Sequence, residues 1–297
     1  MMLDPIMSDR GTTAPDPTTG LQGMHVQLSL PCPSCTYDLR GVSAAGNCPE
    51  CGQSVPDVVT GVIDPLATAL PRLADPRAVG DGLVLVSVGL AACVILPLVA
   101  MVFAGAAALA GKAAISAMVF QSMVWLAFVI TLGGCVLGCW CLRPREGGPL
   151  QTPCRRAVGE VAAGAVAIAA GLGMFQAGGT LAMAGVALTT IGLAAGLMGL
   201  RKVLLEAGRR CRVFRAATLR RQRIPTLIFA TVLAGLLLVG SALAELMGSP
   251  NTDLTLGVLG LTVLSVQAIG MAYLVVNTAW IRHDLRQPPP TLDELVG

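Results

Sequence analysis

The chain carries five long stretches without a charged side chain. They span residues 82–111, 113–142, 161–200, 224–244 and 254–281. A helix needs about 20 predominantly apolar residues to cross the hydrocarbon core of a bilayer. Each stretch reaches that length, and the third is long enough for two crossings. The pattern therefore predicts an all-α integral membrane protein with about six transmembrane helices.

The helix boundaries follow from the breaks between these stretches. A polar, glycine-rich break at 176–179 suits a tight helical hairpin between the third and fourth helices. Pro225 fits the first turn of the fifth helix, whereas Pro97 lies inside the first helix and should kink it. We expect helices at Leu83–Leu109, Ile115–Cys141, Ala157–Phe175, Thr180–Leu200, Pro225–Met247 and Leu254–Ile281.

The Lys and Arg residues between the helices predict the orientation. With a cytoplasmic N-terminus, the inner segments carry fifteen Lys and Arg residues, and the outer segments carry Lys112 alone. Positively charged loops stay on the cytoplasmic side, so we expect both termini in the cytoplasm. No signal-peptide pattern occurs before Asp81, which agrees with a cytoplasmic N-terminal region.

Composition divides the rest of the chain. Over half of the residues are hydrophobic and 12% are charged, against roughly a quarter charged in soluble domains. The opening residues have almost nothing to bury and are expected to be disordered. We expect a disordered lead at 1–23, a cysteine-bearing module at 24–56, a linker at 57–82, the bundle at 83–281 and a cytoplasmic tail at 282–297.

Two C-x-x-C turns form the most specific motif. Cys32 and Cys35 form the first pair, and Cys48 and Cys51 form the second after twelve intervening residues. This spacing is typical of a four-thiolate, tetrahedral zinc site. Four thiolates leave no open coordination position, which favours one structural Zn²⁺ over a catalytic ion. The metal would also supply folding free energy to a segment too small to bury a core of its own.

Other chemistries for these four cysteines are weaker. A redox dithiol would sit in a βαβ context that the sequence lacks. Disulfides would need an oxidising compartment, and the predicted topology places the cysteines in the cytoplasm. Iron remains open because four thiolates can also hold it.

The cysteine module resembles a zinc ribbon common in planctomycete-type bacteria, with the pattern C-P-x-C-x-Y-D-L-R-G…C-P-E-C-G. The similarity covers about residues 31–53 and departs at Thr36, where these ribbons usually have Gly. Such ribbons precede soluble or membrane regions mostly of unassigned function, and the resemblance implies a bacterial cell (inner) membrane here. It also implies that Tyr37 and Leu39 pack against the cysteine turns. Asp38 and Arg40 would face solvent.

Small residues recur along the third and fourth helices. In lipid, small residues allow close helix approach and so drive helix association. We favour contacts inside the bundle, and the alternative is a homo-oligomer interface. The glycines are Gly159, Gly164 and Gly171 in the third helix and Gly178, Gly185, Gly192 and Gly199, every seven residues, in the fourth.

A basic segment at 201–224 follows the fourth helix. Nine Lys and Arg residues lie between Arg201 and Arg223. An amphipathic helix there would lie on the inner leaflet with its arginines among anionic lipid headgroups. Alternatively, the arginines only fix the topology. Nucleic acid is disfavoured, because residues 1–80 carry eight acids and four basic residues. The apolar face would hold Leu204, Ala207, Cys211, Phe214 and Thr218.

No catalytic constellation can be recognised. His25 and His283 lack neighbours with metal-ligand spacing. Glu160 and Glu245 lie near helix ends, and Gln267 is the deepest strongly polar residue. The other cysteines are expected to be ordinary thiols, and a second metal site is the alternative for those near the inner face: Cys139, Cys141, Cys154 and Cys211.

Two hypotheses about function follow. We favour a non-enzymatic membrane protein whose zinc ribbon is a cytoplasmic recognition or stability module, with an unknown cytoplasmic protein as partner. The alternative is a transporter or channel for a neutral or apolar solute. A water-filled cavity that converges on Gln267 at mid-membrane depth would favour the alternative, whereas a well-packed bundle would favour the module.

Overall fold

The computed structural model describes residues 21–63, 75–143, 151–177, 179–211, 223–287, 290 and 292–297. The chain forms two compact units. We call residues 1–69 with 288–297 the cysteine unit, and residues 70–287 the bundle. Residues 1–20 of the expected disordered lead lie outside the described residues.

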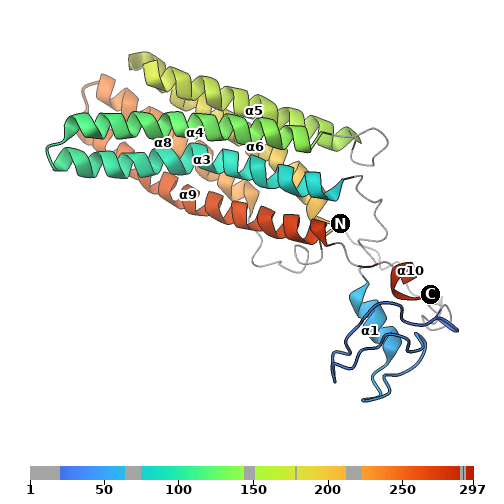
Figure 1. Cartoon of the computed structure of the whole chain (residues 1–297). Coiled ribbons are helices and arrows are strands. Elements are labelled where there is room, and N and C mark those ends of the chain that lie inside the picture. The colour runs from blue at the N-terminus through green and yellow to red at the C-terminus, as the bar shows by residue number, and fades with distance from the viewer. Residues whose placement is uncertain are drawn as a thin grey trace, which may run out of the picture. The chain divides into compact units, whose positions relative to one another are not determined.

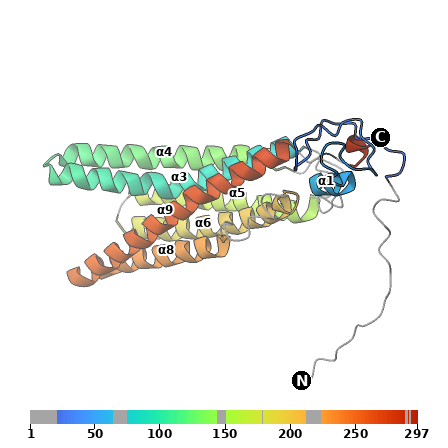
Figure 2. The same cartoon turned by 90° about the horizontal axis from the view of Figure 1, so that it is seen from below.

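Six helices of the bundle are long and apolar enough to cross a membrane, which confirms the predicted class. Their hairpin turns, α3–α4, α5–α6 and α8–α9, lie at one end of the bundle (Figures 1 and 2). We call this the hairpin end. The helices are α3 (Pro76–Leu109), α4 (Ala113–Cys141), α5 (Gln151–Ala177), α6 (Gly179–Gly208), α8 (Ile224–Leu246) and α9 (Pro250–Arg286).

Most of these helices extend beyond the predicted boundaries at the end opposite the hairpin turns. α3 begins at Pro76, before the predicted Leu83, and α9 continues to Arg286, beyond the predicted Ile281. The prediction placed these two boundaries at or near the limits of the uncharged stretches, but backbone hydrogen bonding continues past the hydrocarbon core. Charged side chains in these extensions pair with each other: Arg286 donates to Asp81 at 2.9 Å. α3 also continues through Pro97.

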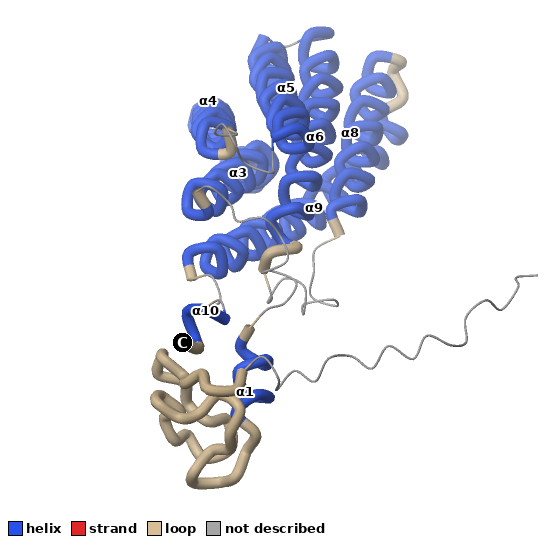
Figure 3. The backbone as a smooth tube through the Cα atoms, turned by 90° about the vertical axis from the view of Figure 1, so that its right-hand side faces the viewer, coloured by secondary structure: helices blue, strands red, loops and turns tan. Residues whose placement is uncertain are grey.

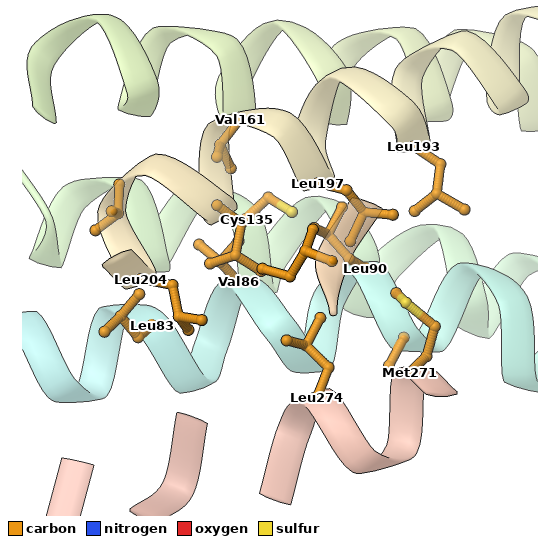
Figure 4. Packing of buried hydrophobic residues seen from close by; sticks show 14 of the residues in the cluster. Leu83, Val86, Leu90, Cys135, Val161, Leu193, Leu197, Leu204, Met271 and Leu274 are labelled. Atoms are coloured by element: carbon orange, nitrogen blue, oxygen red, sulfur yellow. The ribbon is translucent and has the colours of Figure 1, made fainter. Parts of the chain in front are cut away.

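The bundle has two layers that one oblique helix links. Viewed along the helices, α4 and α3 form one layer, and α5, α6 and α8 form the other (Figure 3). α9 runs from beside α8 at the hairpin end to beside α3 (Figure 2). Buried side chains from both layers and from α9 meet between the layers, including Leu90 of α3, Leu197 of α6 and Leu274 of α9 (Figure 4). Large apolar side chains such as Phe229 and Ile269 remain exposed. This outer surface suits contact with lipid.

Glycines bring α5 and α6 together, as the intramolecular interpretation of their spacing predicts. A methyl group added at Gly192 would lie 2.7 Å from the carbonyl oxygen of Gly164. One added at Gly199 would lie 2.6 Å from the carbonyl oxygen of Ala157. Both distances are shorter than van der Waals contact, so only glycine fits. Gly159 faces open space, and Gly178 lies outside the described residues.

A second glycine contact, which the sequence analysis missed, joins α3 to α4. A methyl group at Gly134 would lie 2.8 Å from the carbonyl oxygen of Leu85. Nearby, the buried hydroxyl of Thr131 donates to the carbonyl oxygen of Gly89 at 3.0 Å. Close approach of the two backbones thus exposes a carbonyl of one helix to a side chain of the other.

The described part of the basic segment, up to Cys211, differs from its prediction. α6 does continue past Leu200, but it ends at Gly208. The side chains of Leu204, Ala207 and Cys211 are buried in the core of the bundle and do not face lipid. They belong to the protein interior because α6 lies within its layer between α5 and α8. Phe214, Thr218 and the remaining arginines up to residue 222 lie outside the described residues.

Candidate functional site

Two similar backbone turns build the cysteine site. In the first turn, the N–H of Cys32 donates to Tyr37 at 2.8 Å, and the N–H of Thr36 donates back to Cys32 at 2.8 Å. In the second turn, the N–H of Cys48 donates to Gln53 at 2.7 Å, and the N–H of Gly52 donates back to Cys48 at 2.9 Å. Each residue of one turn therefore has a counterpart sixteen positions away in the other.

Both turns need a left-handed backbone directly after their second cysteine. Gly52 has a φ of 74°, and its counterpart Thr36 has a φ of 63°. Left-handed backbone costs glycine little but is unfavourable for a β-branched residue. Thr36 is the residue at which this chain departs from the ribbon pattern. It is also the one non-glycine residue with positive φ in the described part of the chain.

The two turns bring the four sulfur atoms together. All four Sγ atoms lie within 4.8 Å of one another. Cys32 and Cys51 are 3.5 Å apart, and Cys35 and Cys48 are 3.6 Å apart. Sulfurs around one tetrahedral zinc ion with 2.3 Å bonds lie about 3.8 Å apart. These four cysteines could therefore hold a metal ion with small adjustments.

The thiols of this cluster differ in acidity. Burial raises the pKa of Cys32, but hydrogen bonds from the backbone of Ser34 and Cys35 outweigh that effect and lower it to about 7. For Cys35, the backbone hydrogen bond at Tyr37 lowers the pKa, but burial and the other cysteine sulfurs raise it to about 12. The first proton thus leaves readily, and the shared negative charge then resists further ionisation.

A small apolar core supports the cysteine site, contrary to the expectation that the segment buries no core of its own. Helix α1 (Val55–Val62) begins at Ser54, whose hydroxyl accepts from the N–H of Asp57 at 3.4 Å. Val55 and Val59 of α1 are fully buried against Leu39 and Leu30. Leu21, which we assigned to the disordered lead, is also buried there.

The end of the chain completes this core. After the short helix α10 (Leu292–Leu295), the N–H of Gln27 donates to Leu295 at 2.7 Å, and His25 and Gly297 exchange two backbone hydrogen bonds. Leu295 and Val296 are 2% and 3% exposed. The predicted cytoplasmic tail is therefore divided: residues 282–287 belong to the bundle, and residues 288–297 belong to the cysteine unit.

The side chains between the two turns partly match the resemblance. Leu39 is fully buried, and Asp38 and Arg40 are exposed, as expected. Tyr37, which was expected to pack against the turns, is instead 39% exposed. Its counterpart in the second turn is the polar residue Gln53, so neither turn needs a buried side chain here. Hydrogen bonds, first from the backbone of Arg40 and then from Leu30, lower the pKa of Asp38.

A large cavity lies inside the bundle, apart from the cysteine unit. Its volume is about 930 Å³, and it extends from Thr180 and Leu246 at the hairpin end to Gln267. Aliphatic and aromatic side chains of all six long helices line most of it. The polar lining residues include Thr231 and Glu245. The bundle is thus not packed throughout, because this cavity occupies part of the space between its helices.

Gln267 lies at the inner limit of this cavity and is 1% exposed. Its Nε2 donates to Oγ1 of Thr231 at 2.6 Å, and the Thr231 hydroxyl donates to Leu227 at 2.8 Å. Oε1 of Gln267 has no hydrogen-bond partner. The predicted interhelical hydrogen bond therefore exists, and it leaves one buried acceptor unused.

Within the part of the chain that the structure describes, the other candidate residues form no common metal site. Glu160 pairs with Lys202, and Cys139 lies 3.8 Å from the carbonyl oxygen of Val158. His25 lies 3.2 Å from the carbonyl oxygen of Gly41. Within the described residues, the metal-compatible cluster consists of the four N-terminal cysteines. The side chain of Cys154 lies outside this description.

Sequence reasoning missed two features of these sites: the cavity and the docked chain end. The apolar Leu-Val pair in an otherwise polar tail was the available signal for the second. Comparisons with family models, curated proteins and solved structures give no match. The fold and the site together define an all-α, multi-pass membrane protein with a four-cysteine cluster able to hold a metal ion.

Proposed function

We propose that the cysteine unit is a structural zinc module with which this membrane protein recognises a cytoplasmic partner. The convergence of four thiols on one point carries this proposal. Zinc suits such a set because it accepts four thiolates in tetrahedral geometry, and the filled coordination shell has no position for a substrate. The module is therefore non-enzymatic.

The charge distribution supports a cytoplasmic location for this module. Basic residues gather at the helix ends opposite the hairpin turns, where the chain enters and leaves the bundle. The positive-inside rule assigns that end to the cytoplasm. Exposed apolar side chains of the cysteine unit, Leu28 and Tyr37, are candidates for partner contact. Aromatic side chains are enriched at protein interfaces.

A comparative pull-down tests this function. Detergent-solubilised wild-type protein would be compared with the double variant Cys48→Ser/Cys51→Ser and with Tyr37→Ala. We expect a soluble partner to be retained by the wild type, lost by the double variant and weakened by Tyr37→Ala. The matched control, Cys139→Ser/Cys141→Ser, alters two cysteines of α4 and should retain the partner. Equal recovery with all four proteins would contradict a recognition role.

The intramembrane cavity favours a second candidate function, passage of a neutral solute. The cavity reaches Gln267 and has a largely apolar lining, whereas the observation expected of a transporter or channel was a water-filled cavity at that residue. Glycerol entry into proteoliposomes, followed by light scattering, tests it. Re-swelling faster than in protein-free vesicles, and slowed by Ala242→Phe in the cavity lining, would support passage. Identical re-swelling with and without the protein would exclude glycerol as a solute.

A further inference from the structure

The cavity of the bundle has the dimensions of a ligand site. Its volume, about 930 Å³, is near the upper end of the roughly 300–1,000 Å³ typical of small-molecule sites. Thr231 lies fifteen residues before Leu246, the end of α8. At 1.5 Å per residue, the cavity is therefore roughly 22 Å long along that helix. An elongated molecule could enter from the hairpin end and reach Gln267.

The inner end of the cavity is closed. Towards the opposite end of the bundle, the next large side chains that are fully buried in three of the helices are Leu90, Leu197 and Met271. They belong to the packed core shown in Figure 4. A molecule that enters the cavity therefore stops beside Gln267 and the Thr231 hydroxyl.

The polar groups of the cavity select for a hydrogen-bond donor. The hydroxyls of Thr189, Thr190 and Thr231 all donate to carbonyl oxygens of their own helices. Oε1 of Gln267 is the buried polar atom of the described lining that has no hydrogen-bond partner. A buried acceptor without a partner is unfavourable, and an O–H or N–H group of a ligand would satisfy it.

The charges of the lining exclude ions as ligands. Among the lining residues there is no Lys or Arg, and the one ionisable acid, Glu245, is an exposed residue at the end of α8. An anion would meet no positive partner, and a cation would have to leave Glu245 to reach the apolar interior. Burying an unpaired charge at that depth is costly. The occupant must therefore be neutral.

We propose that this cavity binds an uncharged apolar alcohol whose hydroxyl donates to Oε1 of Gln267. The apolar chain would lie along α8 between Thr231 and the hairpin end, against Leu238, Val186 and Phe175 of the lining. This binding site concerns the same cavity as the second candidate function, but it does not require that the ligand crosses the membrane. It is independent of the zinc module.

Photolabelling of the full-length protein in detergent tests this proposal. The probe is an octanol that carries a diazirine, and its matched partner is the diazirine-bearing octane without the hydroxyl. We expect the alcohol to label peptides from 231–246 and 261–267 saturably, in competition with unlabelled octanol. Half-saturation by the alkane should require about a five- to tenfold higher concentration, as expected for one lost hydrogen bond.

Two pairs of variants locate the site. Gln267→Leu should raise the half-saturating concentration of the alcohol about five- to tenfold, whereas Gln121→Leu on the exposed face of α4 should not change it. Ala242→Phe should fill part of the cavity and abolish saturable labelling. Ala163→Phe, on the exposed face of α5, should leave saturable labelling unchanged. Thermal melting of each variant checks that the fold persists, and the second pair keeps the test valid if Gln267→Leu unfolds.

Several outcomes would overturn the proposal. Adducts spread over exposed residues without saturation would mean that the probe only dissolves in the detergent layer around the helices. Equal half-saturation by the alcohol and the alkane would mean that Gln267 recognises no donor. A failure of glycerol passage would leave this site intact, because binding and passage are separate readouts.

Discussion

At the residue scale, the two cysteine turns have the same backbone but different residues at one position. Gly52 occupies the left-handed position of the second turn without strain, whereas Thr36 occupies that position of the first turn with a φ of 63°. The sequence pattern identified Thr36 as a departure from the ribbon. The structure adds the physical consequence, because both turns use this residue to direct a backbone N–H at the first cysteine of the turn.

Opposite substitutions at these two positions should have opposite effects. Thr36→Gly should stabilise the metal-bound cysteine unit by about 0.5–1 kcal/mol, because the strain of a β-branched residue exceeds the added chain entropy of glycine. Gly52→Ala should destabilise it by about 1 kcal/mol. A side chain at Gly52 would meet no atom within 4 Å, so the effect would report backbone strain alone. The denaturant concentration at which half of the zinc is released from the full-length protein measures both stability changes. A lower midpoint for Thr36→Gly than for the wild type would contradict the claim that Thr36 is strained.

At the element scale, the sequence predicted the helices and one of the two glycine contacts. The seven-residue spacing in the fourth predicted helix stands out in the sequence, and α5 and α6 use it to pack closely. Helix ends were predicted less well, since charge marks the membrane boundary and not the end of backbone hydrogen bonding. The α3–α4 contact has a less regular glycine pattern and was missed.

A pair of neighbouring glycines in α5 tests the close packing. A methyl group at Gly171 would lie 2.6 Å from the carbonyl oxygen of Gly185, whereas one at Gly173 would meet nothing within 4 Å. Gly171→Ala should therefore lower the stability of the bundle by about 1–3 kcal/mol. Gly173→Ala should change it by less than about 0.5 kcal/mol. Thermal unfolding in detergent compares the two, and equal melting temperatures would count against the contact.

The docked chain end is a second element whose role can be measured. Leu295 is 2% exposed, and Leu292, in the same short helix, is 41% exposed. Leu295→Ala should destabilise the cysteine unit by about 2–4 kcal/mol, because it empties a buried position. Leu292→Ala is the matched control and should have little effect. Zinc release in denaturant is again the measurement. Equal midpoints for Leu295→Ala and Leu292→Ala would mean that the chain end does not support the cysteine site.

At the scale of the whole molecule, local sequence patterns predicted a cysteine unit and a helical bundle. They did not predict which residues the cysteine unit includes or that the bundle contains a cavity. Spacing alone predicted which four cysteines converge, because each C-x-x-C turn aims two sulfurs at one point. No local pattern could pair Val26 with Val296, since that contact joins opposite ends of the chain. The cavity was equally inaccessible, because it depends on how six helices fail to fill the space between them.

The orientation of the bundle is testable with fused reporters. Reporters at the N-terminus, near Arg145 and near Arg215 should indicate the cytoplasm, because fifteen of sixteen interhelical and C-terminal Lys and Arg residues belong to that side. A reporter near Asn251, in the first turn of α9, should indicate the opposite side. A cytoplasmic signal at Asn251 would refute the proposed orientation.

Zinc content per chain tests the central claim most directly. Zinc binds thiolates, and the pKa of Cys35 in the metal-free site is raised to about 12 by burial and by the neighbouring sulfurs, against the backbone hydrogen bond at Tyr37. Binding near pH 7 must therefore displace protons, and occupancy should fall as the pH falls. Elemental analysis of the purified wild type at pH 7.5 should give one zinc per chain. The Cys48→Ser/Cys51→Ser variant should give none. Clearly less than one zinc in the wild type, with the four cysteines paired as two disulfides in reducing buffer, would contradict a zinc module.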